Sequence, residues 1–150
     1  MRFQTRSGYC GAGVVVNMAR ALGQRVSEAR VRALSGTDAS GTDATGIMVA
    51  LRGLGYTATE FNEESAAKAW LILHGSLTQG KPVVLSVDND WHWVACVGDL
   101  GERVVTVDSS RVVKNMCENG VHVLDRRSLL RRWRSSTGTY YGIVAGKASR

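Results

Sequence analysis

Residues 3–23 read FQTRSGYCGAGVVVNMARALG, and they predict a helix that begins next to a cysteine. From about Gly11 to Leu22 the residues are apolar nearly all round, which is typical of a helix buried on every side. Cys10 stands at the edge of this helix, not inside it. A structural cysteine is expected within a helix, packed as a small hydrophobic residue, whereas reactive cysteines are found at such edges.

The residues that follow predict three further helices in the first half of the chain. Ser27 can cap the second helix. In GTDATGIMVALRGLGY (residues 41–56), Thr42 or Thr45 can begin the third. Asn62 can cap the fourth, which we expect to end near residue 78.

The second half of the chain predicts an antiparallel sheet. Short apolar runs separated by turn-forming residues are typical of such strands, and they occupy residues 81–88, 91–98, 103–110, 120–125 and 140–146. Asp125 is expected to cap a helix over Arg126–Trp133. Helices first and strands afterwards indicate an α+β fold, with N-terminal helices packed on an antiparallel sheet. Since no linker or low-complexity tract interrupts the 150 residues, we expect a single domain over residues 1–150.

Composition excludes several classes of protein. With 44% apolar and 21% charged residues, the chain has the composition of a soluble globular protein. No apolar run approaches the roughly 18 residues that a membrane-spanning helix needs. Residues 4–8 are polar or small and do not resemble a secretory signal, so a cytoplasmic location is expected.

The three cysteines, Cys10, Cys96 and Cys117, are an odd number without CxxC spacing, which argues against a disulfide framework and against a cysteine zinc site. We therefore expect each cysteine to carry a thiol that is neither in a disulfide nor bound to zinc. We expect Cys96 to be buried in its strand and Cys117 to be an exposed thiol without a role.

The net charge of +6 comes largely from DRRSLLRRWR, residues 125–134. Leu129, Leu130 and Trp133 share one face of the predicted helix, and the arginines spread over the rest. The simplest interpretation is a solvated basic face. An acidic protein or peptide partner at the Arg126–Arg134 helix is the second interpretation, and nucleic acid is the least favoured.

Cys10 is placed for nucleophilic chemistry. The first turn of a helix presents unpaired N–H groups and a partial positive charge, both of which favour a thiolate. Gly11 and Gly13 would leave room for a substrate backbone. Gln4, six residues before Cys10, could donate its amide to the oxyanion of a tetrahedral intermediate.

A thiolate nucleophile needs an imidazole to exchange protons and a third group to orient that imidazole. Of the three histidines, His92 lies at the head of a predicted central strand. Asp108 lies near the end of a strand able to pair with it, where its carboxylate could accept the second N–H of the imidazole. Other aspartates lie nearby in the sequence and could take this place or cap turns: Asp88, Asp90 and Asp99.

QTRSGYCGAG, residues 4–13, resembles the oxyanion and nucleophile motif of the C39 peptidases, papain-fold cysteine peptidases that cleave leader peptides after a double glycine. Three further stretches are similar to the family's motifs and occur in the family's order: GTDATGI (41–47), HWVACVG (92–98) and VVTVDSS (104–110). The resemblance implies a papain-like α+β fold. It implies that Cys10 is the nucleophile, His92 the base, Asp108 the orienting acid and Gln4 the oxyanion residue.

The expected function is cleavage of a peptide or amide bond in a peptide or protein substrate. None of the four roles requires a metal or an organic cofactor, so none is expected. The same residues could instead transfer the acyl group to an amine, as a transglutaminase or peptide ligase does. A non-catalytic binding module is the alternative from a different class, although such a module has no physical need for all four residues.

Overall fold

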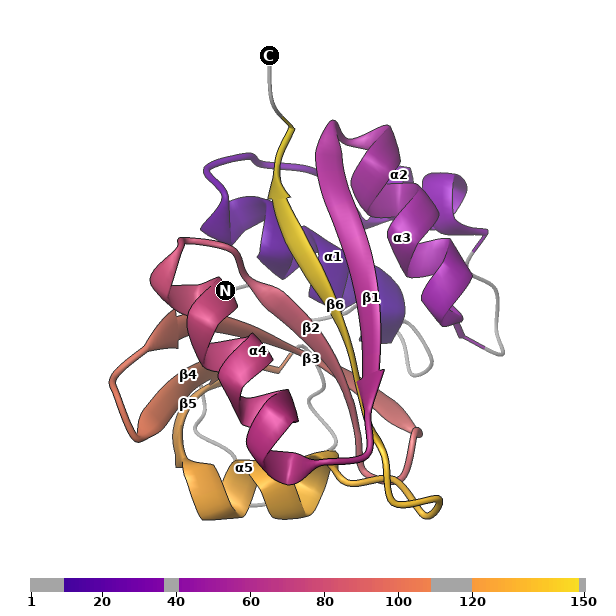
Figure 1. Ribbon diagram of the computed structural model, residues 1–150. Helices are drawn as coiled ribbons and strands as arrows, with labels where there is room; N and C mark the ends of the chain where they lie inside the picture. The colour runs from indigo at the N-terminus through magenta and orange to yellow at the C-terminus, as the bar shows by residue number, and fades with distance from the viewer. Residues whose placement is uncertain (1–9, 37–40, 109–119, 149–150) are drawn as a thin grey trace.

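The computed structural model describes residues 10–36, 41–108 and 120–148. Within them, helices and strands follow in the order shown in Figure 1: α1 (Cys10–Ala21), α2 (Glu28–Ser35), α3 (Ala44–Gly53), β1 (Tyr56–Glu63), α4 (Ala66–Thr78), β2 (Val83–Val87), β3 (His92–Asp99), β4 (Arg103–Val107), β5 (Val121–Asp125), α5 (Arg126–Trp133) and β6 (Tyr140–Lys147). The strands form an antiparallel sheet, so the expected α+β fold is confirmed.

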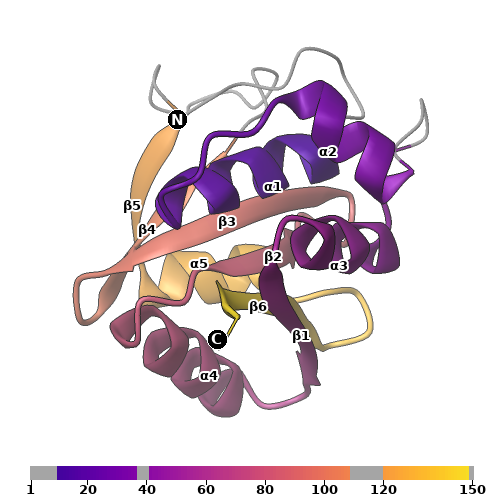
Figure 2. The same cartoon turned by 90° about the horizontal axis from the view of Figure 1, so that it is seen from above.

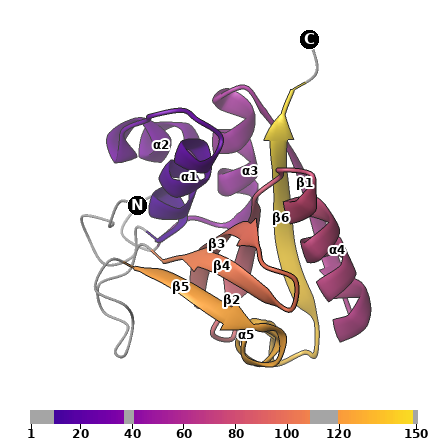
Figure 3. The same ribbon diagram turned by 90° about the vertical axis from the view of Figure 1, so that its left-hand side faces the viewer.

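Helices cover both faces of this sheet. Helices α1, α2 and α3 lie on one face, and α4 and α5 lie on the other, as the views in Figures 2 and 3 show. Alternate strand residues point to opposite faces, so each face has its own hydrophobic core. Val84, Ala95 and Ile143 join the core under α1, whereas Val83 and Leu85 join the core under α4 and α5.

Helix α1 packs across β3 (Figure 2), and most of its apolar residues are buried. Val14, Val15, Met18 and Ala19 are at most 1% exposed. The prediction of a helix buried on every side is therefore confirmed over residues 11–19, whereas Arg20 and Ala21 are exposed.

Strand order in the sheet is β1-β6-β2-β3-β4-β5. Strands β2 to β5 are neighbours in chain order, as the spacing of the apolar runs predicted. Strand β6 instead enters between β1 and β2 and pairs antiparallel with both. Its position inside the sheet, with a strand on either side, explains why Ile143 and Ala145 are fully buried.

Two sequence predictions about helix starts were wrong. Asn62 does not cap α4 but lies in β1, a strand that the sequence had not indicated, where it pairs with Tyr141. Helix α4 begins after Ser65, whose Oγ accepts a hydrogen bond from the backbone N–H of Lys68 at 3.3 Å. Because β1 occupies the residues up to Glu63, the helix cannot start at Asn62.

The start of α3 also differs from the expectation of Thr42 or Thr45. Asp43 is its cap, and the Asp43 Oδ1 accepts from the backbone N–H of Gly46 at 2.7 Å. The backbone carbonyl of Thr42 is used differently, since it accepts a hydrogen bond from the Trp93 indole. The predicted caps Ser27 and Asp125 are confirmed.

Candidate active site

His92 and Asp108 form a hydrogen-bonded pair. His92 begins β3, and Asp108 directly follows β4. The two strands pair antiparallel with Ala95 opposite Val107, so the next position along brings Asp108 opposite Val94 and to the same face as His92. The His92 Nε2 lies 2.7 Å from the Asp108 Oδ1.

This pair lies at the edge of the protein interior. The Asp108 side chain is 1% exposed, whereas the His92 side chain is 11% exposed. An ionised Asp108 accepts the Nε2–H of His92, so in the neutral imidazole the lone pair lies on Nδ1. Asp108 thereby selects the tautomer in which Nδ1 is the basic nitrogen.

The start of α1 and the head of β3 meet at one residue, Thr42. The Trp93 Nε1–H donates to the backbone carbonyl of Thr42 at 3.0 Å. On the other side, a β-carbon added to Gly11 would lie 2.5 Å from the Thr42 Cβ. Since Gly11 follows Cys10 and Trp93 follows His92, this contact brings the backbones of both predicted catalytic positions to the same end of the molecule.

The structure therefore assigns Gly11 a role other than the one expected. The sequence indicated that Gly11 leaves room for a substrate backbone, but Thr42 occupies that space. Helix α1 begins at Cys10, one residue before the expected start at Gly11, so Cys10 is its first residue. Its side chain and the whole of Gln4 lie outside the described residues.

The remaining aspartates near His92 in the sequence have other partners. Asp99 lies 2.9 Å from the Nδ1 of His74, away from His92 along the sheet. Asp90 accepts a hydrogen bond from the Ser86 hydroxyl at 2.8 Å. Asp108 is therefore the aspartate that pairs with His92 in the described part of the chain, as predicted.

Sequence reasoning missed Arg132. It treated the arginines of residues 126–134 as one basic face, but Arg132 turns toward the site. Its guanidinium donates to both oxygens of Asp88 at 2.8 Å and to the Asp108 Oδ2 at 3.2 Å. These two carboxylates raise the pKa of Arg132 despite the opposing effect of burial. No sequence signal distinguishes it from its neighbours.

The hairpin turn before His92 has an unusual backbone. Asp88, Asn89 and Asp90 all have positive φ, from 55° to 65°. Aspartate and asparagine tolerate this region better than other non-glycine residues, because their side chains form local hydrogen bonds. The Asn89 Oδ1 accepts from the backbone N–H of Ser136 at 2.9 Å, which ties the turn to the segment after α5.

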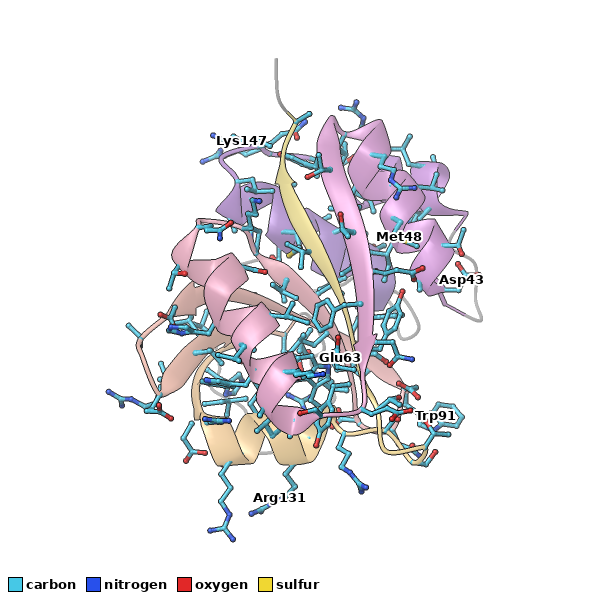
Figure 4. All side chains as sticks on the ribbon, in the orientation of Figure 1. Asp43, Met48, Glu63, Trp91, Arg131 and Lys147 are labelled. Carbon is cyan, nitrogen blue, oxygen red and sulfur yellow. The ribbon has the colours of Figure 1, made fainter. Side chains whose placement is uncertain are left out.

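A pocket of about 470 Å³ opens between Thr42 and this hairpin. Trp93 and Tyr141 form aromatic walls, and Asp43 and Asp90 contribute acidic groups. Figure 4 shows Asp43 and Trp91 on the same side of the molecule. Trp91 is 85% exposed, and it lies between Asp90, which lines the pocket, and His92.

The Cys96 thiol is fully buried, as predicted, and burial raises its pKa to about 12. Cys117 lies outside the described residues. Among the residues that the structure does describe, no group of three or more potential ligands is arranged to hold a metal ion. Of the helices in the described ranges, none has the length and apolar character needed to cross a membrane.

Comparison with known sequences gives one family. The sequence model described as Peptidase C39 family matches residues 1–133, most of the chain. A comparison with curated protein sequences found no match.

Comparison with solved structures gives the same fold. The peptidase domain of Streptococcus ComA, described as a bi-functional ABC transporter involved in a quorum sensing pathway, superposes with a TM-score of 0.74 at 21% identity, over 98% of this chain and 97% of that one. A double glycine motif protease from an AMS/PCAT transporter, solved in complex with the leader peptide, has a TM-score of 0.69 at 16% identity, over 97% and 89%. A Bacillus anthracis protein described as C39-like has a TM-score of 0.66 at 13% identity, over 100% and 96%.

Proposed function

Because the chain belongs to the peptidase C39 family, we propose that it is a cysteine peptidase with Cys10 as nucleophile and His92 as base. Asp108 orients the imidazole, and Gln4 stabilises the oxyanion. The observation that carries the proposal is the 2.7 Å hydrogen bond between His92 and Asp108 at the end of the sheet where α1 begins.

The geometry of this pair supports a particular direction of proton transfer. Asp108 accepts from Nε2, so Nδ1 is the nitrogen that takes the thiol proton of Cys10. The resulting imidazolium is stabilised by the buried carboxylate. The thiolate is stabilised by the imidazolium and by the free N–H groups of the first turn of α1.

The reaction is acyl transfer. The Cys10 Sγ attacks the carbonyl carbon of the scissile bond, and the carbonyl oxygen becomes an oxyanion held by the Gln4 amide and the Cys10 N–H. The His92 imidazolium gives its proton to the leaving nitrogen as the C–N bond breaks, which leaves a thioester on Cys10. Water, deprotonated by His92, then attacks the thioester and releases the acid and the free thiol.

A peptide is the substrate class that the site supports. The related double glycine motif protease was solved with a leader peptide. In this chain, the pocket beside Thr42 and Trp93 offers aromatic walls and hydrogen-bonding groups, and Trp93 is the residue after His92 in β3. Such a mixture suits a peptide segment with both apolar and polar side chains.

Selective alkylation tests the proposal without a known substrate. Iodoacetamide at about pH 6 should modify Cys10 well before Cys96 and Cys117, because only an activated thiol is ionised there. Mass spectrometry of the digested protein identifies the modified cysteine. His92→Ala should abolish the preference in a sample that remains folded.

Peptide cleavage tests whether the activated thiol goes on to break a peptide bond. The protein is incubated with a pool of peptides, some containing two adjacent glycines, with Cys10→Ala as the matched control. Products that appear only with the unaltered protein support a peptidase, and products joined to an added amine indicate acyl transfer instead. Equal alkylation of Cys10 and Cys117 in a folded sample, with no cleavage, would reject an activated nucleophile and favour a binding module.

A further inference from the structure

We propose that Arg132 is a positioning residue for the His92–Asp108 pair. The proposal rests on the catalytic role proposed for that pair. It separates Arg132 from the other arginines of residues 126–134, which the sequence had grouped with it.

The two oxygens of Asp108 have different partners. Oδ1 accepts from His92 at 2.7 Å, and Oδ2 accepts from the Arg132 Nη2 at 3.2 Å. Rotation of the carboxylate about its Cβ–Cγ bond would break both hydrogen bonds. Arg132 therefore fixes the direction in which Asp108 presents Oδ1 to the imidazole.

Asp88 fixes Arg132 in turn. The Nε and Nη2 of Arg132 donate to the two oxygens of Asp88 at 2.8 Å each, in the planar bidentate geometry that a guanidinium favours. The backbone N–H of Asp88 donates to the backbone carbonyl of Arg132 at 3.0 Å. Asp88 is four residues before His92, so the same arginine holds both the turn that leads into β3 and the carboxylate that orients the imidazole.

The net charge of the three side chains favours a protonated His92. Asp88, Arg132 and Asp108 together carry a net charge of −1, which stabilises an imidazolium on His92. If Arg132 were absent, the carboxylates of Asp88 and Asp108 would lose the cation that bridges them. Arg132 from α5 carries the charge that joins Asp108 to Asp88 of the hairpin, and the same charge also reaches the buried thiol of Cys96 in β3.

The neighbouring arginines do not share these contacts. Arg131, one residue away, is exposed, and Figure 4 shows it pointing away from the protein below α5. Arg126 lies over the Trp70 ring at 5.4 Å from the centroid. Arg131→Gln therefore removes the same charge from the same helix without touching the site, which makes it a matched control.

The experiment measures the alkylation rate of Cys10 by iodoacetamide across pH in the full chain, for Arg132→Gln, Arg132→Lys, Asp88→Asn and Arg131→Gln. Arg132→Gln should move the titration midpoint of Cys10 up by about one pH unit, because an imidazole that is no longer held in place by Asp108 stabilises the thiolate less. Cleavage of the best peptide from the pool should fall roughly 10- to 100-fold in kcat with little change in KM, because the imidazole is no longer held in line.

Arg132→Lys separates charge from geometry. Lysine keeps the cation but lacks the planar fork that spans both carboxylates. It should therefore resemble Arg132→Gln in both the titration midpoint and kcat, because the position of the imidazole depends on the fork. Asp88→Asn should lower kcat in the same direction as Arg132→Gln, and it provides the test if Arg132→Gln does not fold.

Profiles of Arg132→Gln and Asp88→Asn that superpose on those of Arg131→Gln and the unaltered protein would overturn the proposal. So would a loss explained entirely by a higher KM. If Cys10 of the unaltered protein shows no preference over Cys117, the proposed function itself fails, and this is visible without any arginine variant.

Discussion

Thr42 fills the space into which a side chain at Gly11 would project, with the Thr42 Cβ 2.5 Å from the position of an added β-carbon. Since α1 is buried on every side, the helix cannot shift away without disturbing its contacts with β3. Gly11→Ala should therefore lower the free energy of unfolding by about 1–3 kcal/mol. Urea denaturation followed by circular dichroism measures this change.

Gly75→Ala is the matched control for Gly11→Ala. Gly75 also lies in a helix, but nothing lies within 4 Å of an added β-carbon. Alanine at this position should stabilise α4 by roughly 0.5–1 kcal/mol through its higher helix propensity. Equal effects of the two substitutions would mean that Thr42 does not constrain Gly11.

The Cys96 thiol makes stability depend on pH in the alkaline range. Burial raises its pKa from 9.0 to about 12, so the folded protein keeps a proton that the unfolded chain releases. This contribution to stability is complete below about pH 9 and is lost as pH rises toward 12. The free energy of unfolding should fall by at most about 1.4 kcal/mol per pH unit from this group.

Cys96→Ala isolates that effect from the other titrating groups. Its free energy of unfolding should fall less steeply than that of the unaltered protein between about pH 9 and pH 10, measured in urea with a reducing agent. The prediction concerns the difference between the two slopes. The stability that is lost because alanine is smaller than cysteine does not affect this difference. Parallel slopes would show that the folded protein releases the Cys96 proton as easily as the unfolded chain.

Asp108→Asn should impair catalysis while preserving the fold. An amide at this position has only one oxygen that can accept a hydrogen bond, and its NH₂ group would face either His92 or Arg132, both of which are donors in the observed arrangement. Loss of the correct imidazole tautomer should lower kcat by on the order of 10²- to 10⁴-fold. Peptide cleavage measures this change, and a loss smaller than a few-fold would contradict the orienting role.

The sequence predicted the wrong cap for α4, and two substitutions test the cap that the structure shows. Ser65→Ala removes the hydroxyl that accepts from Lys68 N–H and should cost about 1 kcal/mol in stability. Asn62→Ala, in β1, should leave the helical content of α4 unchanged. Thermal denaturation and helical circular dichroism of both variants compare the two positions. A larger loss of helical signal for Asn62→Ala would reverse the assignment.

Strand β1 shows why part of the fold was not predictable. Its residues YTATEFNE are mostly polar or exposed, and Ala58 is the buried position among them. Its partner in the sheet is β6, which follows far along the chain, so no local hairpin pattern marks it. Strands β2 to β4, by contrast, have buried apolar residues and short turns between neighbours, and the sequence predicted them.

The candidate site also has a part that the sequence predicted and a part that it did not. Asp108 was predictable because the strand and turn pattern sets the register that brings it to His92. Arg132 was not, because its role depends on where α5 packs and on the positive φ of the turn at Asp88. Three of the chemically similar arginines beside it remain exposed, namely Arg127, Arg131 and Arg134.

The position of β6 between β1 and β2 sets an order for folding during synthesis. Strand β1 leaves the ribosome early, but its hydrogen-bonding partner β6 is made much later. Until β6 arrives, β1 and the facing edge of β2 both carry unpaired backbone groups, which is a hazard for aggregation. The nascent chain therefore cannot close its sheet until residues 140–147 emerge, and chaperones that shield strand edges would act on it mainly in this interval.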